Sequence, residues 1–136
     1  MAYWLLKTEP EAFSWNDQVA RGQEGEPWSG VRNHQAKNFI KAMKPGDQAF
    51  FYHTSTHREI VGIVDIVSEP YSDPTDTAWA AVTTVANRSF EQAVTLSQIK
   101  KHIGLVDMAL IKQSRLSVQP VKNEEWDLII GLGQKP

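Results

Sequence analysis

The sequence contains no cysteine, which excludes disulfide bridges, thiolate nucleophiles and cysteine metal sites. Of its four histidines, His34, His53, His57 and His102, only His53 and His57 lie in an HxxxH spacing, and none lies in an HExxH motif. No apolar run approaches the ~20 residues of a membrane span. The first residues also lack the basic and small-residue parts of a signal peptide. We therefore expect a cytoplasmic protein that uses no membrane, metal or cofactor.

The composition is that of one ordinary globular domain. The 136 residues are 41% hydrophobic and 22% charged. This length favours a single domain over residues 1–136, and we expect it to be a monomer. The formal net charge of −2 argues against coating of a polyanion, but it leaves room for a local basic patch.

Hydrophobic periodicity predicts both helices and strands. Ala36, Phe39, Ile40 and Met43 recur at helical spacing and predict a helix over about 33–43. Strands are expected over 3–7, 48–53, 59–67, 79–88 and 116–118, short helices over 14–20 and 95–103 and after Asn123, and a loop over 71–77. Because these elements do not alternate as βαβ units, we predict an α+β fold. About five strands would curl into a small mixed barrel with short peripheral helices.

An indole, a glycine turn and an amide lie together before the predicted helix of residues 33–43. Trp28 precedes Gly30, Val31, Arg32 and Asn33. A flat aromatic ring, an amide with donor and acceptor, and free N–H groups at a helix start are what a planar nucleobase needs. Plainer interpretations exist for two of them. Trp28 can be a hydrophobic plug, and Asn33 can be a helix N-cap.

The same segment is basic. Arg32 precedes the predicted helix, which carries Lys37 and Lys41 on one stripe, and no acidic residue occurs over 27–46. Such a stripe suits phosphate groups, although a solvated helix face is the plainer interpretation.

The ends of two predicted strands carry further candidates. Lys7, Thr8 and Glu9 would support acyl transfer, with threonine as nucleophile and a partly buried lysine as base. Strand neighbours point to opposite faces, however, so Lys7 and Glu9 share a face that Thr8 does not. A weak surface ion pair is the plainer interpretation. Tyr52 and His53 end the aromatic strand, where His53 is either a core histidine or a group facing the site.

Seven blocks, in order along nearly the whole chain, resemble the signature of the EVE domain. They are YWLLKTEP (3–10), WSGVRNHQAKNF (28–39), MKPGD (43–47), FFYH (50–53), VGIV (61–64), YSDPT (71–75) and RLSVQPV (115–121). The resemblance implies a PUA-like fold, a curved and mostly antiparallel barrel with helices at its rim. It also implies similarity to YTH domains, which hold a methylated adenine of RNA in an aromatic cage.

Carried over block by block, the resemblance makes Trp28 the first cage tryptophan and Asn33 a base contact. Lys7 and Thr8 match the strand-end Lys-Ser of YTH domains, and Trp79 corresponds to the second cage region. The resemblance thus implies a non-enzymatic module that binds nucleic acid, DNA or RNA, through a modified base. The residues expected at the ligand are Lys7, Thr8, Trp28, Gly30, Val31, Arg32, Asn33, Tyr52, His53 and Ser117, and those expected at phosphates are Arg32, Lys37 and Lys41.

Two alternatives stay open. ASCH domains share the PUA-like fold, and some hydrolyse an acetylated cytidine with Lys, Thr and Glu. Lys7, Thr8 and Glu9 would then form the catalytic set of a small amidohydrolase. A protein-interaction adaptor that uses the basic helix is the other alternative.

Overall fold

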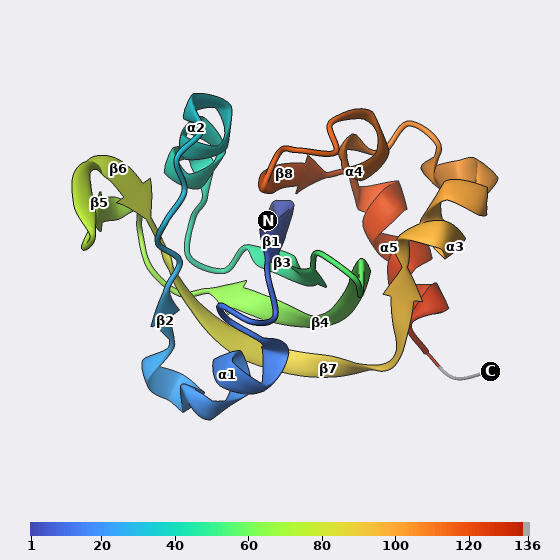
Figure 1. Cartoon of the computed structure of the whole chain (residues 1–136), viewed down its shortest axis with the longest axis horizontal. Helices are drawn as coiled ribbons and strands as arrows, with labels where there is room; N and C mark the ends of the chain where they lie inside the picture. The colour runs from blue at the N-terminus through green and yellow to red at the C-terminus, as the bar shows by residue number, and fades with distance from the viewer. Residues whose placement is uncertain (135–136) are drawn as a thin grey trace.

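The computed structural model describes residues 1–134, which form an α+β structure built on a curled sheet (Figure 1). The strands are β1 (Tyr3–Thr8), β2 (Glu26–Pro27), β3 (Gln48–His53), β4 (Glu59–Ile66), β5 (Tyr71–Asp73), β6 (Asp76–Ala81), β7 (Thr83–Thr95) and β8 (Val118–Val121). Six of them form one sheet in the order β2-β7-β4-β3-β1-β8, and β5 pairs with β6. Strands β1 and β3 are parallel, whereas the other neighbours are antiparallel. The curled half-barrel confirms the predicted PUA-like α+β class, with more strands than the five expected.

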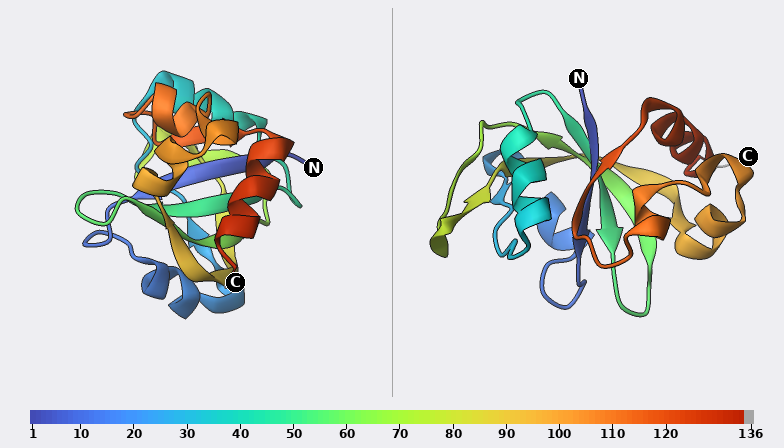
Figure 2. Two further views of the ribbon diagram at one scale, coloured as in Figure 1. Left: turned by 90° about the vertical axis from the view of Figure 1, so that its right-hand side faces the viewer. Right: turned by 90° about the horizontal axis from the view of Figure 1, so that it is seen from above.

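Short helices pack around the sheet (Figure 2). They are α1 (Trp15–Ala20), α2 (His34–Ala42), α3 (Leu96–Lys101), α4 (Ala109–Lys112) and α5 (Asn123–Leu132), with single 3-10 turns η1 (Gly22–Glu24) and η2 (Ile103–Leu105). Ser14 and Thr95, at the start of two helices predicted over 14–20 and 95–103, are N-caps that accept a hydrogen bond from the first turn of α1 and α3. The helix predicted after Asn123 is α5, which begins at Asn123 itself and has Lys122 as its N-cap. Within residues 1–134, none of the helices combines the length and the apolar character needed to cross a membrane.

A bulged strand lets helix α1 lie against the sheet. The register between β4 and β7 shifts between Ile60 and Gly62. A Cβ atom on Gly62 would come 2.5 Å from the indole of Trp15. A glycine inside a strand is typical of a bulge or a close backbone approach, and Gly62 has both.

The segment 71–77, predicted as a loop, instead forms a hairpin. Asp73 ends β5, and its Oδ1 accepts hydrogen bonds from the backbone N–H and the hydroxyl of Thr75 at 2.7 and 2.6 Å. This side-chain turn reverses the chain into β6. The strand predicted over 79–88 is consequently divided between the end of β6 and the start of β7.

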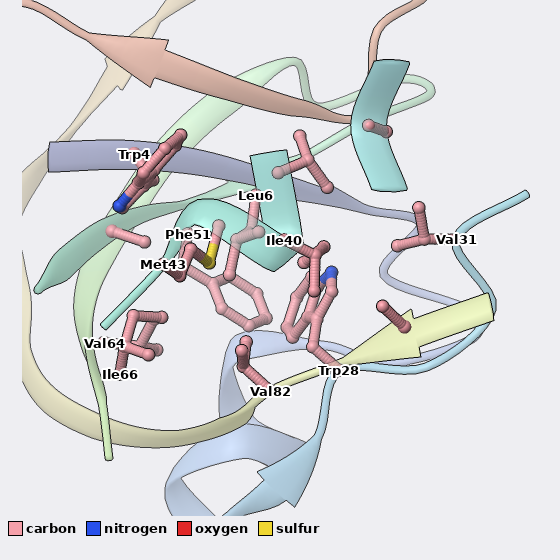
Figure 3. Close-up of a cluster of buried hydrophobic side chains, with 14 of the residues drawn as sticks. Trp4, Leu6, Trp28, Val31, Ile40, Met43, Phe51, Val64, Ile66 and Val82 are labelled. Atoms are coloured by element: carbon pink, nitrogen blue, oxygen red, sulfur yellow. The ribbon is translucent and has the colours of Figure 1, made fainter. Parts of the chain in front are cut away.

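The apolar residues form two clusters, one on each face of the sheet. Leu6 and Phe51 belong to one cluster, and their neighbours Leu5 and Phe50 belong to the other. This division follows from strand geometry, because successive side chains point to opposite faces. The first cluster joins the sheet to α2 and contains Trp28 (Figure 3). The second joins the sheet to α3, α4 and α5.

Candidate nucleic-acid interface

Trp28 is a core residue that also borders a small cavity. Its side chain lies in the first apolar cluster and is only 6% exposed (Figure 3). The indole meets Phe51 edge-on at 5.6 Å between ring centres and Phe13 at 6.1 Å. A cavity of about 120 Å³ is lined by Lys7, Thr8, Phe13, Glu26, Pro27, Trp28 and Ser29. The hydrophobic plug and the cavity wall are therefore the same side chain, and we call this space the Trp28 cavity.

Lys7 supplies the cationic group of the Trp28 cavity. Its Nζ donates to the carbonyl of Ser114 at 2.7 Å and lies 5.8 Å from the centre of the Tyr52 ring. Burial lowers the pKa of Lys7 and raises the pKa of the Tyr52 phenol. The backbone N–H of Lys7 donates to the carbonyl of Ser117 at 2.9 Å, so Ser117 supports the end of β1 through its backbone.

The structure does not bring Lys7, Thr8 and Glu9 together as a catalytic set. The Thr8 hydroxyl donates to the carbonyl of Phe13 at 3.0 Å, with a weaker contact of 3.4 Å to the carbonyl of Glu9. The Glu9 side chain is exposed, and within residues 1–134 no ion pair joins it to Lys7. Acyl transfer needs a nucleophile within hydrogen-bonding reach of a base. The hydrogen bonds of Lys7 and Thr8 do not form this arrangement.

Asp73 tethers the turn that follows Trp28. Its Oδ2 accepts a hydrogen bond from the N–H of Gly30 at 2.8 Å and lies 3.1 Å from Nη1 of Arg32. Burial alone would raise the pKa of Asp73, but hydrogen bonds from Thr75, Gly30 and Arg32 together hold it far below its usual range. Arg32 was expected at a phosphate, whereas here a buried carboxylate engages its guanidinium. Asp73 was not among the site residues predicted from the sequence, although Asp-Pro-Thr is typical of a turn.

Asn33 lies at a different hollow from Trp28. Its Oδ1 accepts the N–H of Ala36 at 3.0 Å, which makes it the N-cap of α2. A hollow of about 350 Å³ is lined by Asn33, Gln35, Gln113, Ser114, Arg115 and Leu116. The structure therefore places Trp28 and Asn33 at separate hollows, in contrast to the common pocket expected for them. Val31, expected at the ligand, is buried in the first apolar cluster.

Lys37, Lys41 and Trp79 line a third space, a groove of about 370 Å³ whose lining comes from α2, the β5–β6 hairpin and Pro70. Figure 1 shows α2 and this hairpin next to each other. Lys37 Nζ donates to the carbonyl of Ala78 at 2.8 Å and lies 5.5 Å from the Trp79 ring centre. The ring of His34 lies 5.0 Å from that of Trp79. Trp79 thus lines this groove and not the Trp28 cavity, contrary to its predicted place in a shared aromatic cage.

His53 has a structural role at the start of α1. Its Nε2 accepts the backbone N–H of Trp15 at 3.0 Å, and its ring meets Phe51 edge-on at 5.6 Å. Burial, and secondly the nearby His57, lower the pKa of His53. These contacts favour the core-histidine interpretation. Within the part of the chain that the structure describes, no group of three or more His, Asp or Glu side chains is placed to hold a metal ion.

Comparison with known proteins connects this geometry to a family. Residues 2–132 match the EVE domain. The chain belongs to the EVE domain family. It is 36% identical over 167 residues to thymocyte nuclear protein 1 of Gallus gallus, which covers 98% of this chain and 69% of that protein. The solved structure of a Rhodopseudomonas palustris protein shares 50% identity and a TM-score of 0.93, covering 98% of this chain and 93% of the other.

A further EVE relative is similar to this chain and was solved with a ligand. The crystal structure of human THYN1 in complex with DNA containing 5-methylcytosine is 31% identical to this chain, with a TM-score of 0.91. It covers 100% of this chain and 99% of the other. In the present protein, and not in THYN1, the blocks 3–10 and 28–39 are those numbered above. They supply most residues of the Trp28 cavity, and the block 71–75 supplies Asp73, which tethers Gly30.

Proposed function

We propose that this EVE domain binds DNA that carries a modified base such as 5-methylcytosine, and that it holds this base in the Trp28 cavity. The observation that carries the proposal is the complex of human THYN1 with 5-methylcytosine DNA, because that chain has the same fold over 100% of this one. The Trp28 cavity supports it from within this chain, because its aromatic walls and polar mouth suit a heterocycle.

The size of the cavity favours one ring as the bound unit. Its volume of about 120 Å³ is below the roughly 300–1,000 Å³ of sites for drug-sized ligands. A base stacked inside a duplex cannot reach such a space, so we expect it to be flipped out, at a cost of a few kcal/mol. Stacking on an aromatic side chain contributes roughly 1–3 kcal/mol per base and offsets much of this cost.

Two polar groups of the cavity match the edge of a pyrimidine. As an ammonium group Lys7 has three N–H donors, and its bond to Ser114 uses one. The others suit a ring carbonyl or a phosphate at the cavity mouth. The Thr8 hydroxyl already donates to Phe13, so its free lone pairs suit an exocyclic amino group. Lys37 and Lys41 on α2 remain candidates for phosphates farther along the strand.

A matched pair of tryptophan variants tests the proposal. Trp28→Phe keeps an aromatic ring in the first apolar cluster but changes the wall of the cavity. Trp126→Phe makes the same change in the second cluster, where Trp126 stacks on Phe50 at 3.9 Å between ring centres. Binding of each folded variant to duplexes with and without 5-methylcytosine is measured by fluorescence anisotropy.

We expect the wild type to bind the modified duplex more tightly, and Trp28→Phe to lose more than tenfold of this preference. Trp126→Phe should keep the preference, because its ring does not line the cavity. An equal loss for modified and plain duplexes in Trp28→Phe would contradict a base in the Trp28 cavity. Loss of preference in both variants would indicate a general effect of weakened packing and would contradict it equally.

A further inference from the structure

A basic hollow lies where the β3–β4 turn meets helix α3. Its volume is about 430 Å³. The lining residues are Thr56, His57, Arg58, Thr95, Leu96, Ser97, Lys100 and Lys101. Two lysines, an arginine and a histidine thus surround one space together with the hydroxyl groups of Thr56 and Ser97, which are donors that phosphate oxygens accept from. The Thr95 hydroxyl is engaged with Gln98 in the cap of α3. We call this space the α3 hollow.

The fold leaves the charges of the α3 hollow uncompensated. Its lining contains no Asp or Glu. Within residues 1–134, none of Arg58, Lys100 and Lys101 takes part in an ion pair. The nearest acid in the sequence, Glu59, lies in strand β4 outside the lining. A cluster of one sign in a concave surface concentrates its field, so it attracts anions although the whole chain carries a net charge of −2.

The backbone holds Arg58 in place at this hollow. Ser55 and Arg58 have φ angles of 66° and 46°, a region that side chains larger than glycine rarely adopt. Arg58 Nε donates to the carbonyl of Ser55 at 3.1 Å, and the carbonyl of Arg58 accepts the N–H of Leu96 at 2.8 Å. The first bond closes the turn on itself, and the second joins the turn to α3. The first bond uses only the inner nitrogen of the guanidinium, and the two terminal nitrogens remain for a bidentate contact.

The α3 hollow and the Trp28 cavity lie at the same end of the sheet. Thr8 of the cavity pairs with His53, His53 with Glu59, and Glu59 with Thr95 of the hollow. Three interstrand spacings, about 14 Å, therefore separate Thr8 of the cavity from Thr95 of the hollow along the sheet. A duplex advances about 3.4 Å per nucleotide along each strand, so this span corresponds to roughly four nucleotides. The right-hand view of Figure 2 shows the β1–α1 and β3–β4 loops together at this edge.

We propose that the α3 hollow binds the DNA phosphate backbone about four nucleotides from the base held in the Trp28 cavity. This inference rests on the proposed function for the base itself. Arg58 engages a phosphate through its terminal nitrogens, and Lys100 and Lys101 neutralise charge at the same backbone segment. The hollow adds affinity for every sequence and no preference for the modification, because phosphates carry no base identity.

The salt dependence of binding tests this site. Lys100→Ala/Lys101→Ala removes two exposed charges from the hollow, and Lys112→Ala/Lys122→Ala removes two exposed charges elsewhere. Affinity for a 5-methylcytosine duplex is measured between 50 and 200 mM salt. Loss of two phosphate contacts reduces the slope of log K against log salt by about 1.8. The loss of affinity of Lys100→Ala/Lys101→Ala relative to the wild type is then about tenfold larger at 50 mM than at 200 mM salt. The control variant keeps the wild-type slope.

A length series tests the predicted spacing. The probes are duplexes that extend 2, 4 or 6 base pairs beyond the 5-methylcytosine on one side or on the other. We expect wild-type affinity to rise when one of the two sides reaches about four base pairs, and Lys100→Ala/Lys101→Ala to lack this rise. The same length dependence in both proteins would overturn the inference, as would an unchanged salt slope in the variant.

The two proposals fail in different ways. In one outcome the wild type binds modified and plain duplexes equally, and the salt slope is still smaller in Lys100→Ala/Lys101→Ala than in the wild type. This result overturns the modified base and supports the backbone site. A wild type that prefers the modified duplex, with no slope change in the variant, overturns the backbone site and leaves the base in the Trp28 cavity. Equal slope changes in both double variants would also overturn the α3 hollow, because the effect would then come from net charge alone.

Discussion

The carboxylate of Asp73 accepts a hydrogen bond from the N–H of Gly30 at 2.8 Å, across 43 residues of sequence. The same oxygen lies 3.1 Å from the Arg32 guanidinium. Through these contacts the β5–β6 hairpin sets the course of the turn between Trp28 and helix α2. The wall of the Trp28 cavity is therefore positioned by a residue that does not line it.

Asp73→Asn should lower the free energy of unfolding by about 2–3 kcal/mol, because several hydrogen bonds to a buried charged acceptor are weakened at once. Arg32→Gln is the matched control. It removes the partly exposed partner and leaves the backbone donors of Gly30 and Thr75 in place, so about 1 kcal/mol is expected. Urea unfolding measures both, and equal losses would show that Asp73 acts through Arg32 alone.

Asp47 should make part of the free energy of unfolding depend on pH in the acidic range. It accepts hydrogen bonds from the backbone N–H groups of Ala2 and Lys44 and from the indole of Trp4, each at 3.0 Å. Burial opposes ionisation, but these bonds outweigh it and lower the pKa of Asp47 below 3.8. Its contribution is therefore complete above about pH 4 and is lost as the pH falls through the folded-state pKa.

The matching variant is Asp47→Asn. We expect it to be less stable than the wild type at pH 7 by at least about 2 kcal/mol, and this difference should narrow by pH 2.5. Urea unfolding at the two pH values measures the difference. A gap of constant size would show that the charge of Asp47 has no part in it.

His53 should make stability fall on mild acidification. Burial and then His57 lower its folded-state pKa below 6.5, so the unfolded chain takes up the proton first. The free energy of unfolding should therefore decrease as the pH falls from 7.5 through about 6.5. Protonation of Nε2 also removes the acceptor of the Trp15 N–H. In His53→Gln, whose amide oxygen can accept this bond, the slope between pH 7.5 and 5.5 should be smaller. An unchanged slope would assign the effect to other groups.

Two glycine-to-alanine changes should have opposite signs. A Cβ on Gly62 would come 2.5 Å from the Trp15 ring, so Gly62→Ala should destabilise the fold by about 1–3 kcal/mol. Gly131 lies in α5 with no atom within 4 Å of the added Cβ. Gly131→Ala should stabilise by about 0.5–1 kcal/mol, because it reduces the entropy of the unfolded chain and suits a helix. Thermal unfolding distinguishes these outcomes, and destabilisation of similar size in both would contradict the packing described for Gly62.

Local sequence signals predicted most elements of the fold. The apolar stripe and the amide of Asn33 predicted α2, because helical spacing and N-capping act within a few residues. The aromatic run over 48–53 predicted β3 within its observed bounds. The β5–β6 hairpin escaped prediction, because β5 has only three residues and the turn is closed by the side chain of Asp73.

The candidate site was predicted less completely than the fold. Lys7, Thr8 and Trp28 were chosen from the sequence, and all three line one cavity. Phe13 and Glu26 line it too, but no motif marks them, because the β1–α1 loop and β2 bring them there. Lys100 and Lys101 were treated as part of a short helix, since their proximity to Arg58 depends on pairing between β4 and β7.

By itself the sequence determined the family, the α+β class and which side chains are available for chemistry, because these depend on residue types and on spacing along the chain. The tertiary structure alone decided which of them meet. It separated Asn33 from Trp28 and engaged Arg32 with Asp73. It also aligned the Trp28 cavity with the α3 hollow along one sheet edge. These outcomes depend on strand register and on contacts across tens of residues, which no local periodicity encodes.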